Sequence, residues 1–186
     1  LAAGQDVLTI LEENLDNRTV LNLQGCTLDM VLYYPDREIP VLAVMQDGSA
    51  VLVIGFNEQN KLIVGNMTGR QALEYGLRDA VTFKPIFIVN YVPVEVTGTG
   101  GGVNPRTVIG QREDGAVLLL VIDGRQTTSL GASYSDCIDI MTQYGAMNAA
   151  NLDGGSSSVM VYDGQIINNV VSMNGDRKVP TAFIVK

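Results

Sequence analysis

The stretch TVIGQREDGAVLLLVI, residues 107–122, decides the fold of this chain. Apolar and β-branched residues fill Thr107–Gln111 and Ala116–Ile122, and the Asp114-Gly115 pair between them is typical of a tight hairpin turn. The stretch therefore predicts two neighbouring antiparallel strands, and we expect the rest of the chain to build on this hairpin.

Similar apolar runs, separated by turn residues, lie on both sides of the hairpin. A second hairpin is predicted from Val159–Tyr162 and Gln165–Asn168, because Asp163-Gly164 between them is a two-residue type I′ signal. A short strand is expected to end at Leu152. The remaining predicted strands are Leu28–Tyr33, Val41–Met45, Ala50–Gly55, Lys61–Val64, Ile86–Val89, Val92–Val96 and Thr181–Val185.

Three segments show helical spacing of apolar residues. Gln5–Leu15 is amphipathic, and Gln71–Arg78 follows a capping-box pair, Thr68 and Gln71. A second such pair, Ser133 and Asp136, begins a predicted helix that stops at Gly145. Since strands outnumber helices and do not alternate with them, we expect an α+β fold: a mixed, largely antiparallel sheet with a few packed helices.

Composition narrows the possible functions. The 186 residues, 46% of them apolar, are enough for one domain over residues 1–186, and the net charge of −8 argues against nucleic-acid binding and polybasic membrane attachment. The chain has no histidine, which excludes His-dependent triads and His-ligated zinc sites within it. No apolar run reaches the length of a transmembrane helix, and we expect no signal peptide in this chain. Cys26 and Cys137 form no CxxC motif, and a bridge between them stays open.

Polar residues cluster where apolar strands end, which is where a scaffold usually presents a site. The segment Asn151–Ser158 reads NLDGGSSS, with the Asp153 carboxylate at a strand end, two glycines that permit close backbone approach, and three hydroxyls. An Asx-type turn capped by Asp153 is the simpler interpretation of the same residues.

Three further clusters carry arginines. Asn104–Thr107 follows a glycine-rich loop whose amides are able to bind an anion, with Arg106 as a bidentate donor. Asp123–Arg125 closes an apolar strand, and Arg177 lies in a late polar segment. Each cluster also has a simpler structural interpretation. Asn104–Thr107 is then part of a surface loop, Asp123–Arg125 is a turn with a surface ion pair, and Arg177 is a solvated loop cation.

Without histidine, two carboxylates are the natural acid and base, and arginines are the natural partners of phosphate charge. That combination fits glycosyl transfer in which the leaving group is a phosphate, because such a leaving group needs nearby cations more than a strong acid. The local pattern does not decide which carboxylates form the pair.

In this order, the four clusters resemble the phosphodiester glycosidase family. The family has an Asn-Pro-Arg-Thr element, an Asp-Gly-Arg after the next apolar strand, a Leu-Asp-Gly-Gly-Gly-Ser-Ser signature and an Arg-x-Val-Pro near the C-terminus. The counterparts here are Asn104–Thr107, Asp123–Arg125, Leu152–Ser157 and Arg177–Pro180, and the similarity covers about residues 83–186.

The resemblance implies hydrolysis of a sugar-1-phosphodiester, with GlcNAc-1-phosphate-type or envelope glycopolymer substrates, and an extracellular or cell-envelope location. It assigns Asp153 as the main catalytic carboxylate and Asp123 as its partner. Substrate and phosphate contacts are expected from Asn104, Arg106, Thr107, Arg125, Asn151, Gly154, Gly155, Ser156, Ser157 and Arg177. The arginines act as phosphate clamps, and the serines as hydrogen-bonding ligands rather than nucleophiles, because no activating base is visible.

The chain departs from the family pattern at two places. Ser156 stands where the family has the third glycine of its signature, and Asn22–Gly25 is a poor substitute for an upstream Asn-Gly-Gly-Phe/Tyr-Phe segment. We therefore expect an N-terminal part of the family's site to be missing from this chain.

Other interpretations stay open. One is a non-catalytic phosphoglycan-binding module of the cell surface, and another is a structural protein whose Gly/Ser loops are simple turns. No cofactor is required, although Asp123, Asp153 and a bound phosphate are able to hold Mg²⁺ or Ca²⁺. The oligomeric state is left open.

Overall fold

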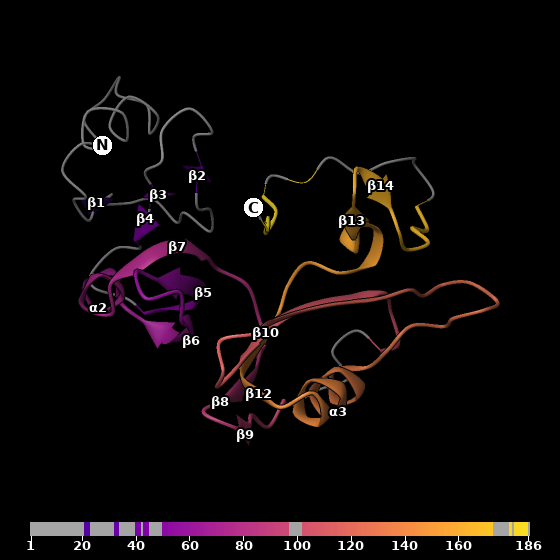
Figure 1. Ribbon diagram of the computed structural model, residues 1–186, viewed down its shortest axis with the longest axis horizontal. Coiled ribbons are helices and arrows are strands. Elements are labelled where there is room, and N and C mark those ends of the chain that lie inside the picture. Colours follow the sequence, from indigo (N-terminus) through magenta and orange to yellow (C-terminus); the bar gives the residue numbers. More distant parts are fainter. Residues whose placement is uncertain are drawn as a thin grey trace. The chain divides into compact units, whose positions relative to one another are not determined.

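The structure is a computed structural model that describes residues 21–22, 32–33, 40–41, 43–44, 50–96, 102–172, 179 and 181–185. The chain divides into two compact units, Leu1–Thr82 and Phe83–Lys186 (Figure 1). Each unit has its own sheet. The single domain expected over residues 1–186 stays a prediction.

The first unit is built on a three-stranded antiparallel sheet. Its central strand, β5 (Val51–Asn57), pairs with β6 (Leu62–Met67) and with β7 (Leu77–Val81), as the apolar runs at 50–55 and 61–64 predicted. A small core of Val53, Met67, Ala72 and Ala80 lies between this sheet and the helix α2 (Gly69–Glu74). Four two-residue strands complete the described part of this unit: β1 (Leu21–Asn22) parallel to β4 (Ala43–Val44), and β2 (Leu32–Tyr33) antiparallel to β3 (Pro40–Val41).

Helix α2 is shorter than the predicted Gln71–Arg78. The capping box forms as expected: the Thr68 amide donates to Gln71 Oε1 at 2.9 Å, and the Gln71 amide donates to Thr68 Oγ1 at 3.3 Å. The helix nevertheless ends at Glu74, since Gly76 adopts a left-handed φ of +64° and the residues from Leu77 onward pair with β5. The prediction that the helix extends to Arg78 is therefore wrong.

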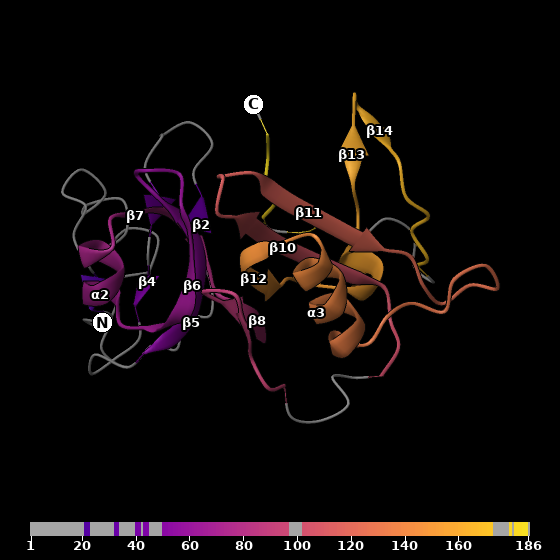
Figure 2. The same cartoon turned by 60° about the horizontal axis from the view of Figure 1, so that its bottom comes forward.

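The second unit contains a five-stranded antiparallel sheet in the order β11-β10-β12-β8-β9. Figure 2 labels β11, β10, β12 and β8 of this sheet. Its strands are β8 (Ile86–Val89), β9 (Val92–Pro93), β10 (Arg106–Arg112), β11 (Val117–Ile122) and β12 (Ala146–Asn151). The hairpin predicted from residues 107–122 is confirmed: β10 and β11 pair from Arg106 opposite Ile122 to Gln111 opposite Val117. The strand predicted over Val92–Val96 is real but ends at Pro93.

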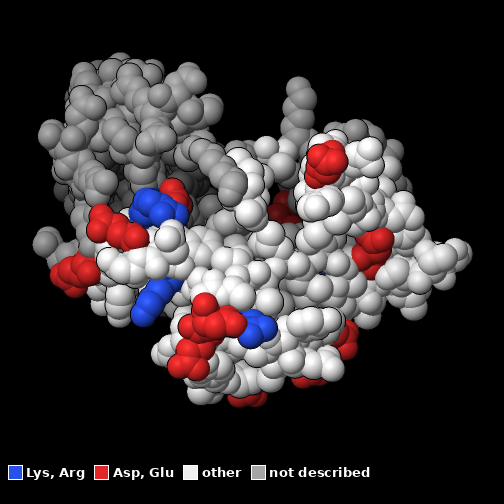
Figure 3. Space-filling view, in the orientation of Figure 1, with Lys and Arg blue, Asp and Glu red and all other residues white. Residues whose placement is uncertain are grey.

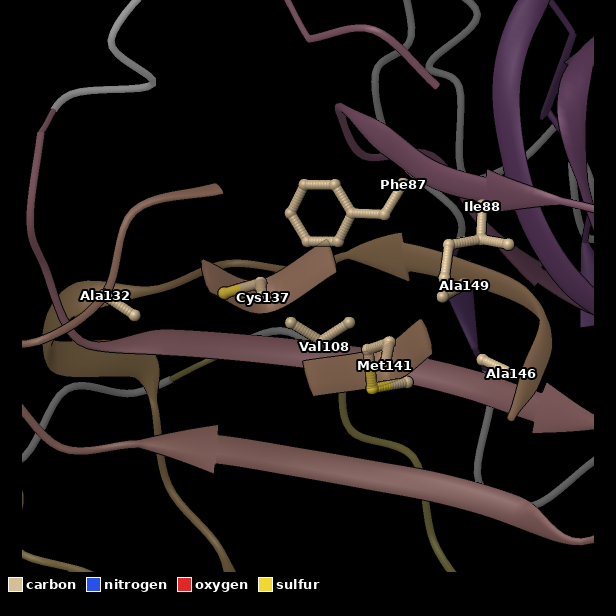
Figure 4. Close-up of a cluster of buried hydrophobic side chains, with 8 residues drawn as sticks. All are labelled: Phe87, Ile88, Val108, Ala132, Cys137, Met141, Ala146 and Ala149. Carbon is tan, nitrogen blue, oxygen red and sulfur yellow. The ribbon is translucent and has the colours of Figure 1, made fainter. Parts of the chain in front are cut away.

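Helix α3 (Tyr134–Gln143) packs on this sheet and forms the main core. Ser133 and Asp136 make the predicted capping box, and Gly145, with a φ of +76°, follows the helix end. Figure 4 shows Phe87, Cys137 and Met141 gathered around Val108 of β10. Cys137 is buried and is a free thiol, while Cys26 lies outside the described residues.

A short hairpin lies near the end of the described residues. β13 (Val161–Tyr162) and β14 (Gln165–Ile166) pair around Asp163 and Gly164, whose φ values of +49° and +72° confirm the predicted turn. The strand predicted over Thr181–Val185 is wrong, because these residues form no regular structure. The helix predicted over Gln5–Leu15 and residues 28–31 of the strand predicted over Leu28–Tyr33 lie outside the described residues. The described residues of the strand predicted over Val41–Met45 belong to β3 and β4.

These elements confirm the α+β class. All pairs of strands except β1 with β4 are antiparallel among the described residues, and the helices there are few. None of those helices is long and apolar enough to cross a membrane. Carboxylates predominate over cations on the face shown in Figure 3, in keeping with the net charge of −8.

Candidate functional site

Three of the four polar clusters meet at one end of the second unit's sheet. Because β10 lies antiparallel to both of its neighbours, the start of β10 faces the ends of β11 and β12. Arg106 is opposite Ile122, and Val108 is opposite Asn151. The segments that begin β10 and follow β11 and β12 therefore share one edge, which we call the motif edge.

Backbone contacts hold these segments together. The Gly155 amide donates to Pro105 O at 2.9 Å, and the Leu152 amide donates to Thr107 O at 2.9 Å. A Cβ atom on Gly154 would lie 2.7 Å from Pro105 O, so only glycine fits that position without a shift. The two glycines of the signature therefore let the loop after β12 approach the Asn-Pro-Arg-Thr segment closely.

Arg125 links the same loops through its side chain. Its Nε and Nη2 donate to Asn104 Oδ1 at 3.2 and 2.9 Å, and the guanidinium lies beside Gly155. The backbone of Arg125 is left-handed, with a φ of +58°, while the side chain is exposed. A charged, exposed guanidinium oriented by an amide oxygen is well suited to a phosphate oxygen.

Asp123 has partners that sequence reasoning missed. Its Oδ1 accepts hydrogen bonds from Asn168 Nδ2 at 3.1 Å and from the Asn169 amide at 3.0 Å, and the Asn169 amide also lies 3.0 Å from Oδ2. The Ser129 hydroxyl donates to the Asp123 carbonyl at 2.6 Å. In the sequence, only the position of Asn168 and Asn169 directly after an apolar strand could have indicated these partners. Nothing in the local pattern connected the two residues to Asp123.

The signature loop presents Asp153 and its serines. Asp153 is exposed, and Ser156 and Ser157 lie in the short helix η3 (Gly155–Ser157). Ser157 Oγ is buried without a hydrogen-bond partner in the described part of the chain. An unpaired buried hydroxyl costs free energy, which makes it a candidate to bind a ligand.

Asn151 and Thr107 lie deeper in the same edge. Asn151 is 3% exposed and its Nδ2 donates to Lys84 O at 2.9 Å, while its Oδ1 has no partner among the described residues. Thr107 Oγ1 is paired with Ser158 Oγ at 3.0 Å. Asn151 Oδ1 is therefore a second buried polar atom at the motif edge without a partner among the described residues.

Arg106 has a different environment from Arg125. It is 6% exposed; its Nε donates to Ala132 O at 2.8 Å and its Nη2 donates to Gly102 O at 2.5 Å. The guanidinium also lies over the Tyr134 ring, with its carbon 4.3 Å from the ring centroid. These contacts point to a role in holding the loops, whereas the phosphate contact expected of Arg106 stays a prediction.

Two expected features have no direct counterpart in the described structure. Arg177 lies outside the described residues. In the described part of the chain, no group of three or more His, Cys, Asp or Glu side chains is placed to hold a metal. A cation held by Asp123, Asp153 and a substrate phosphate stays a prediction.

The chain is similar to several known proteins. It is 40% identical over 67 residues to the SPbeta prophage-derived uncharacterized protein YomE of Bacillus subtilis (strain 168), which is 36% of this chain and 10% of YomE. The zebrafish N-acetylglucosamine-1-phosphodiester alpha-N-acetylglucosaminidase catalytic domain, auto-inhibited by its pro-peptide, has a TM-score of 0.59 at 19% identity. That match covers 81% of this chain and 53% of the zebrafish chain, and therefore shows a shared fold.

A hypothetical protein from Synechocystis has a TM-score of 0.47 at 24% identity, over 59% of this chain and 22% of that chain. This chain thus spans about a tenth of YomE and about half of the zebrafish chain. The family model of phosphodiester glycosidases matches residues 22–186, nearly the whole sequence. The chain therefore belongs to the phosphodiester glycosidase family.

Proposed function

We propose that the motif edge hydrolyses the glycosidic bond of sugar-1-phosphodiesters. In this reaction the bond between the sugar C1 and the phosphate oxygen breaks, and water supplies the hydroxyl that ends on C1. The other water proton ends on the departing phosphate, which remains as a monoester on the second alcohol.

One observation carries the proposal: the exposed Arg125 guanidinium, oriented by Asn104, lies directly beside the Gly155 backbone of the loop that carries Asp153. A cation for the phosphate and a carboxylate for the sugar are thus presented from neighbouring loops. This is the combination that phosphodiester-linked sugars require, because negative charge develops on the phosphate as the bond to C1 breaks.

The residues take distinct roles in this proposal. Asp153 is the main catalytic carboxylate, since it is exposed at the end of its strand. Asp123 is the partner carboxylate, and its orientation is set by Asn168 and Asn169. Arg125 neutralises phosphate charge, and Arg177 is its predicted companion. The serines bind rather than attack, because the chain has no histidine to activate them.

The buried polar atoms of the edge complete the site. Asn151 Oδ1 accepts a hydrogen bond from a sugar hydroxyl, and Ser157 Oγ donates to or accepts from the substrate. Gly154 and Gly155 have no side chains, so a substrate oxygen can approach the main chain at these positions. Ser156 contacts the substrate from the position where the family has glycine.

The first test is release of phosphomonoester from a panel of sugar-1-phosphodiesters that includes GlcNAc-1-phosphate esters. Turnover that Asp153→Asn abolishes and that Asp163→Asn leaves unchanged supports the proposal, because Asp163 is an exposed carboxylate in the turn of the β13–β14 hairpin, outside the signature. Saturable binding without product identifies a phosphoglycan-binding module instead. Absence of both binding and turnover overturns the assignment.

The proposal extends to substrate source and cation use. Envelope or exopolysaccharide-type glycopolymers are the proposed natural substrates, and we place the protein outside the cell or in its envelope. Activity retained after EDTA treatment means that the carboxylates work without a divalent cation. Activity lost with EDTA and restored by Mg²⁺ or Ca²⁺ assigns the ion to Asp123, Asp153 and the phosphate.

A further inference from the structure

A hollow lies at the opposite end of the second unit's sheet, away from the motif edge. Its volume is about 510 Å³, and it is lined by Tyr91, Arg112, Glu113, Asp114, Gln143 and Tyr144, beside Gly145. The motif edge begins at the first residue of β10, Arg106, whereas the hollow begins at its last, Arg112. A strand of this length spans about 20 Å, so the two sites are separate. We call this hollow the tyrosine hollow.

The turn that presents Tyr91 is held in an unfavourable conformation. Asn90 and Tyr91 have left-handed φ values of +48° and +67°. A bulky residue rarely adopts this conformation, which glycine adopts freely. Two hydrogen bonds hold the turn in this conformation. The Asn90 amide donates to Oδ1 of the buried Asn148 at 2.9 Å, and the Tyr91 amide donates to Met147 O at 2.8 Å.

Such strain persists where the surrounding structure determines the backbone, and it is concentrated at functional positions. In a two-residue turn, Asn-Gly would give the same backbone without cost. The chain instead keeps an aromatic ring at this position, 49% exposed. The ring therefore has a use at the surface that burial in a core does not explain.

The second tyrosine is equally well placed. Tyr144 caps the C-terminus of α3 and is 64% exposed, so its ring is available at the wall of the hollow. The Tyr91 hydroxyl donates to Glu113 Oε2 at 2.8 Å, which orients that ring and raises the pKa of Tyr91. Arg112 Nη2 bonds Asp114 Oδ2 at 2.6 Å. The hollow thus combines two exposed aromatic rings, of which Tyr91 is oriented by Glu113, with guanidinium, carboxylate and amide groups.

The charges of the hollow disfavour an anion. Arg112 carries one positive charge against two negative charges on Glu113 and Asp114, and its guanidinium is already paired with Asp114. A neutral, hydroxyl-rich ring suits this lining better, because its apolar face packs on tyrosine while its hydroxyls exchange hydrogen bonds with the planar polar groups. Ligand pockets commonly have volumes of roughly 300–1,000 Å³, which includes this one.

From the two exposed tyrosines, the contacts that hold the turn of Tyr91 and the mixed polar lining, we infer that the tyrosine hollow binds a neutral pyranose unit of a glycan chain. This binding does not depend on the proposed hydrolysis. Together with that function, it means that the protein holds a polymer about 20 Å from the motif edge.

The test is titration of the full chain, labelled with ¹⁵N, with triacetylchitotriose and with maltotriose, neither of which carries phosphate. We expect one of these sugars to bind and to shift the amide signals of Tyr91, Asp114 and Gly145, at the hollow, more than those of Gly154 and Gly155 at the motif edge. Shifts confined to Gly154 and Gly155, or no binding of either sugar at millimolar concentration, overturn the inference.

Two variants each remove one tyrosine ring and should leave the fold intact. Tyr91→Gly relieves the left-handed backbone and Tyr144→Ala truncates an exposed cap residue, and each should weaken binding about three- to tenfold. Tyr162→Ala is the matched control, since Tyr162 is 74% exposed on β13 and does not line the hollow. Equal affinity of all three variants and the unaltered chain contradicts the inference. Turnover of a small sugar-1-phosphodiester, measured in parallel, reports separately on the proposed function.

Discussion

The guanidinium of Arg125 lies so close to Gly155 that a Cβ atom at Gly155 would be 3.3 Å from Nη2 and 3.4 Å from Nη1. This contact joins the loop after β11 to the loop after β12, and the side chain of Asn104 holds the guanidinium in place from the third segment. Arg125, which we propose binds the substrate phosphate, therefore keeps its position only because residue 155 has no side chain.

Gly155→Ala should weaken substrate binding by displacing Arg125. Gly155 has a φ of +62°, so alanine is also strained there and lowers the free energy of unfolding by about 1 kcal/mol. Gly164→Ala is the matched control: its φ is +72°, yet nothing lies within 4 Å of the added Cβ. Urea unfolding should show similar losses for both variants, whereas only Gly155→Ala should raise the KM for a sugar-1-phosphodiester. Equal kinetics in the two variants would contradict the role of this contact.

Arg125→Gln should weaken substrate binding with little effect on folding. The side chain is exposed, and its loss leaves the Asn104 amide in contact with water. We expect KM to rise about tenfold, because a charge-assisted hydrogen bond to phosphate contributes roughly 1.5–3 kcal/mol. Arg78→Gln is a control for loss of an exposed arginine in the first unit. An unchanged KM in Arg125→Gln would remove Arg125 from the phosphate site.

Local signals in the sequence predicted several elements well. The pairs Thr68/Gln71 and Ser133/Asp136 begin helices, and Asp163-Gly164 makes the predicted turn, because each of these structures is determined by neighbouring residues. The hairpin of residues 107–122 was predicted for the same reason.

Contacts between distant residues were not predictable in this way. Helix α2 ends at Glu74 because β7 pairs with β5, whereas the local helical spacing of apolar residues predicted a helix that extends to Arg78. The motif Asn104–Thr107 identified Arg106 as important but not as buried, because its contacts with Ala132 and Tyr134 lie almost thirty residues away along the chain. Position within a motif therefore located the candidate site better than it assigned the role of each side chain.

Arg106 should act through position rather than by contact with substrate. Arg106→Leu removes the donors to Gly102 O and Ala132 O, and we expect a loss of about 2 kcal/mol in unfolding free energy. Arg106→Lys keeps the charge and should recover part of this stability. A phosphate clamp would instead raise KM in Arg106→Lys without destabilising the chain. Urea unfolding and steady-state kinetics of both variants separate these two roles.

Ser133→Ala should destabilise the second unit in a pH-dependent way. The Ser133 hydroxyl and amide donate to Asp136, and these hydrogen bonds lower the pKa of that carboxyl. We expect a loss of about 1 kcal/mol near pH 7. Because the folded-state pKa lies below the unfolded value, the contribution is present above pH ~4 and disappears as the pH falls through the folded-state pKa. The loss of unfolding free energy in Ser133→Ala should therefore be smaller at pH 3 than at pH 7. An equal loss at both pH values would contradict the contribution of the Asp136 carboxylate to the cap.

The buried thiol of Cys137 should be unreactive in the folded chain. Burial raises its pKa from an ordinary value of 9.0 to about 11, so the thiolate is scarce at pH 8. Its contribution to stability is complete below the unfolded pKa and is lost as the pH rises from about 9 through about 11, because only the unfolded thiol ionises readily there. Iodoacetamide should label a Cys26→Ser chain slowly at pH 8 and rapidly in urea, with Cys26→Ser/Cys137→Ala as the blank. Rapid labelling without urea would mean that Cys137 of α3 is not buried in the core beside Phe87, Val108 and Met141.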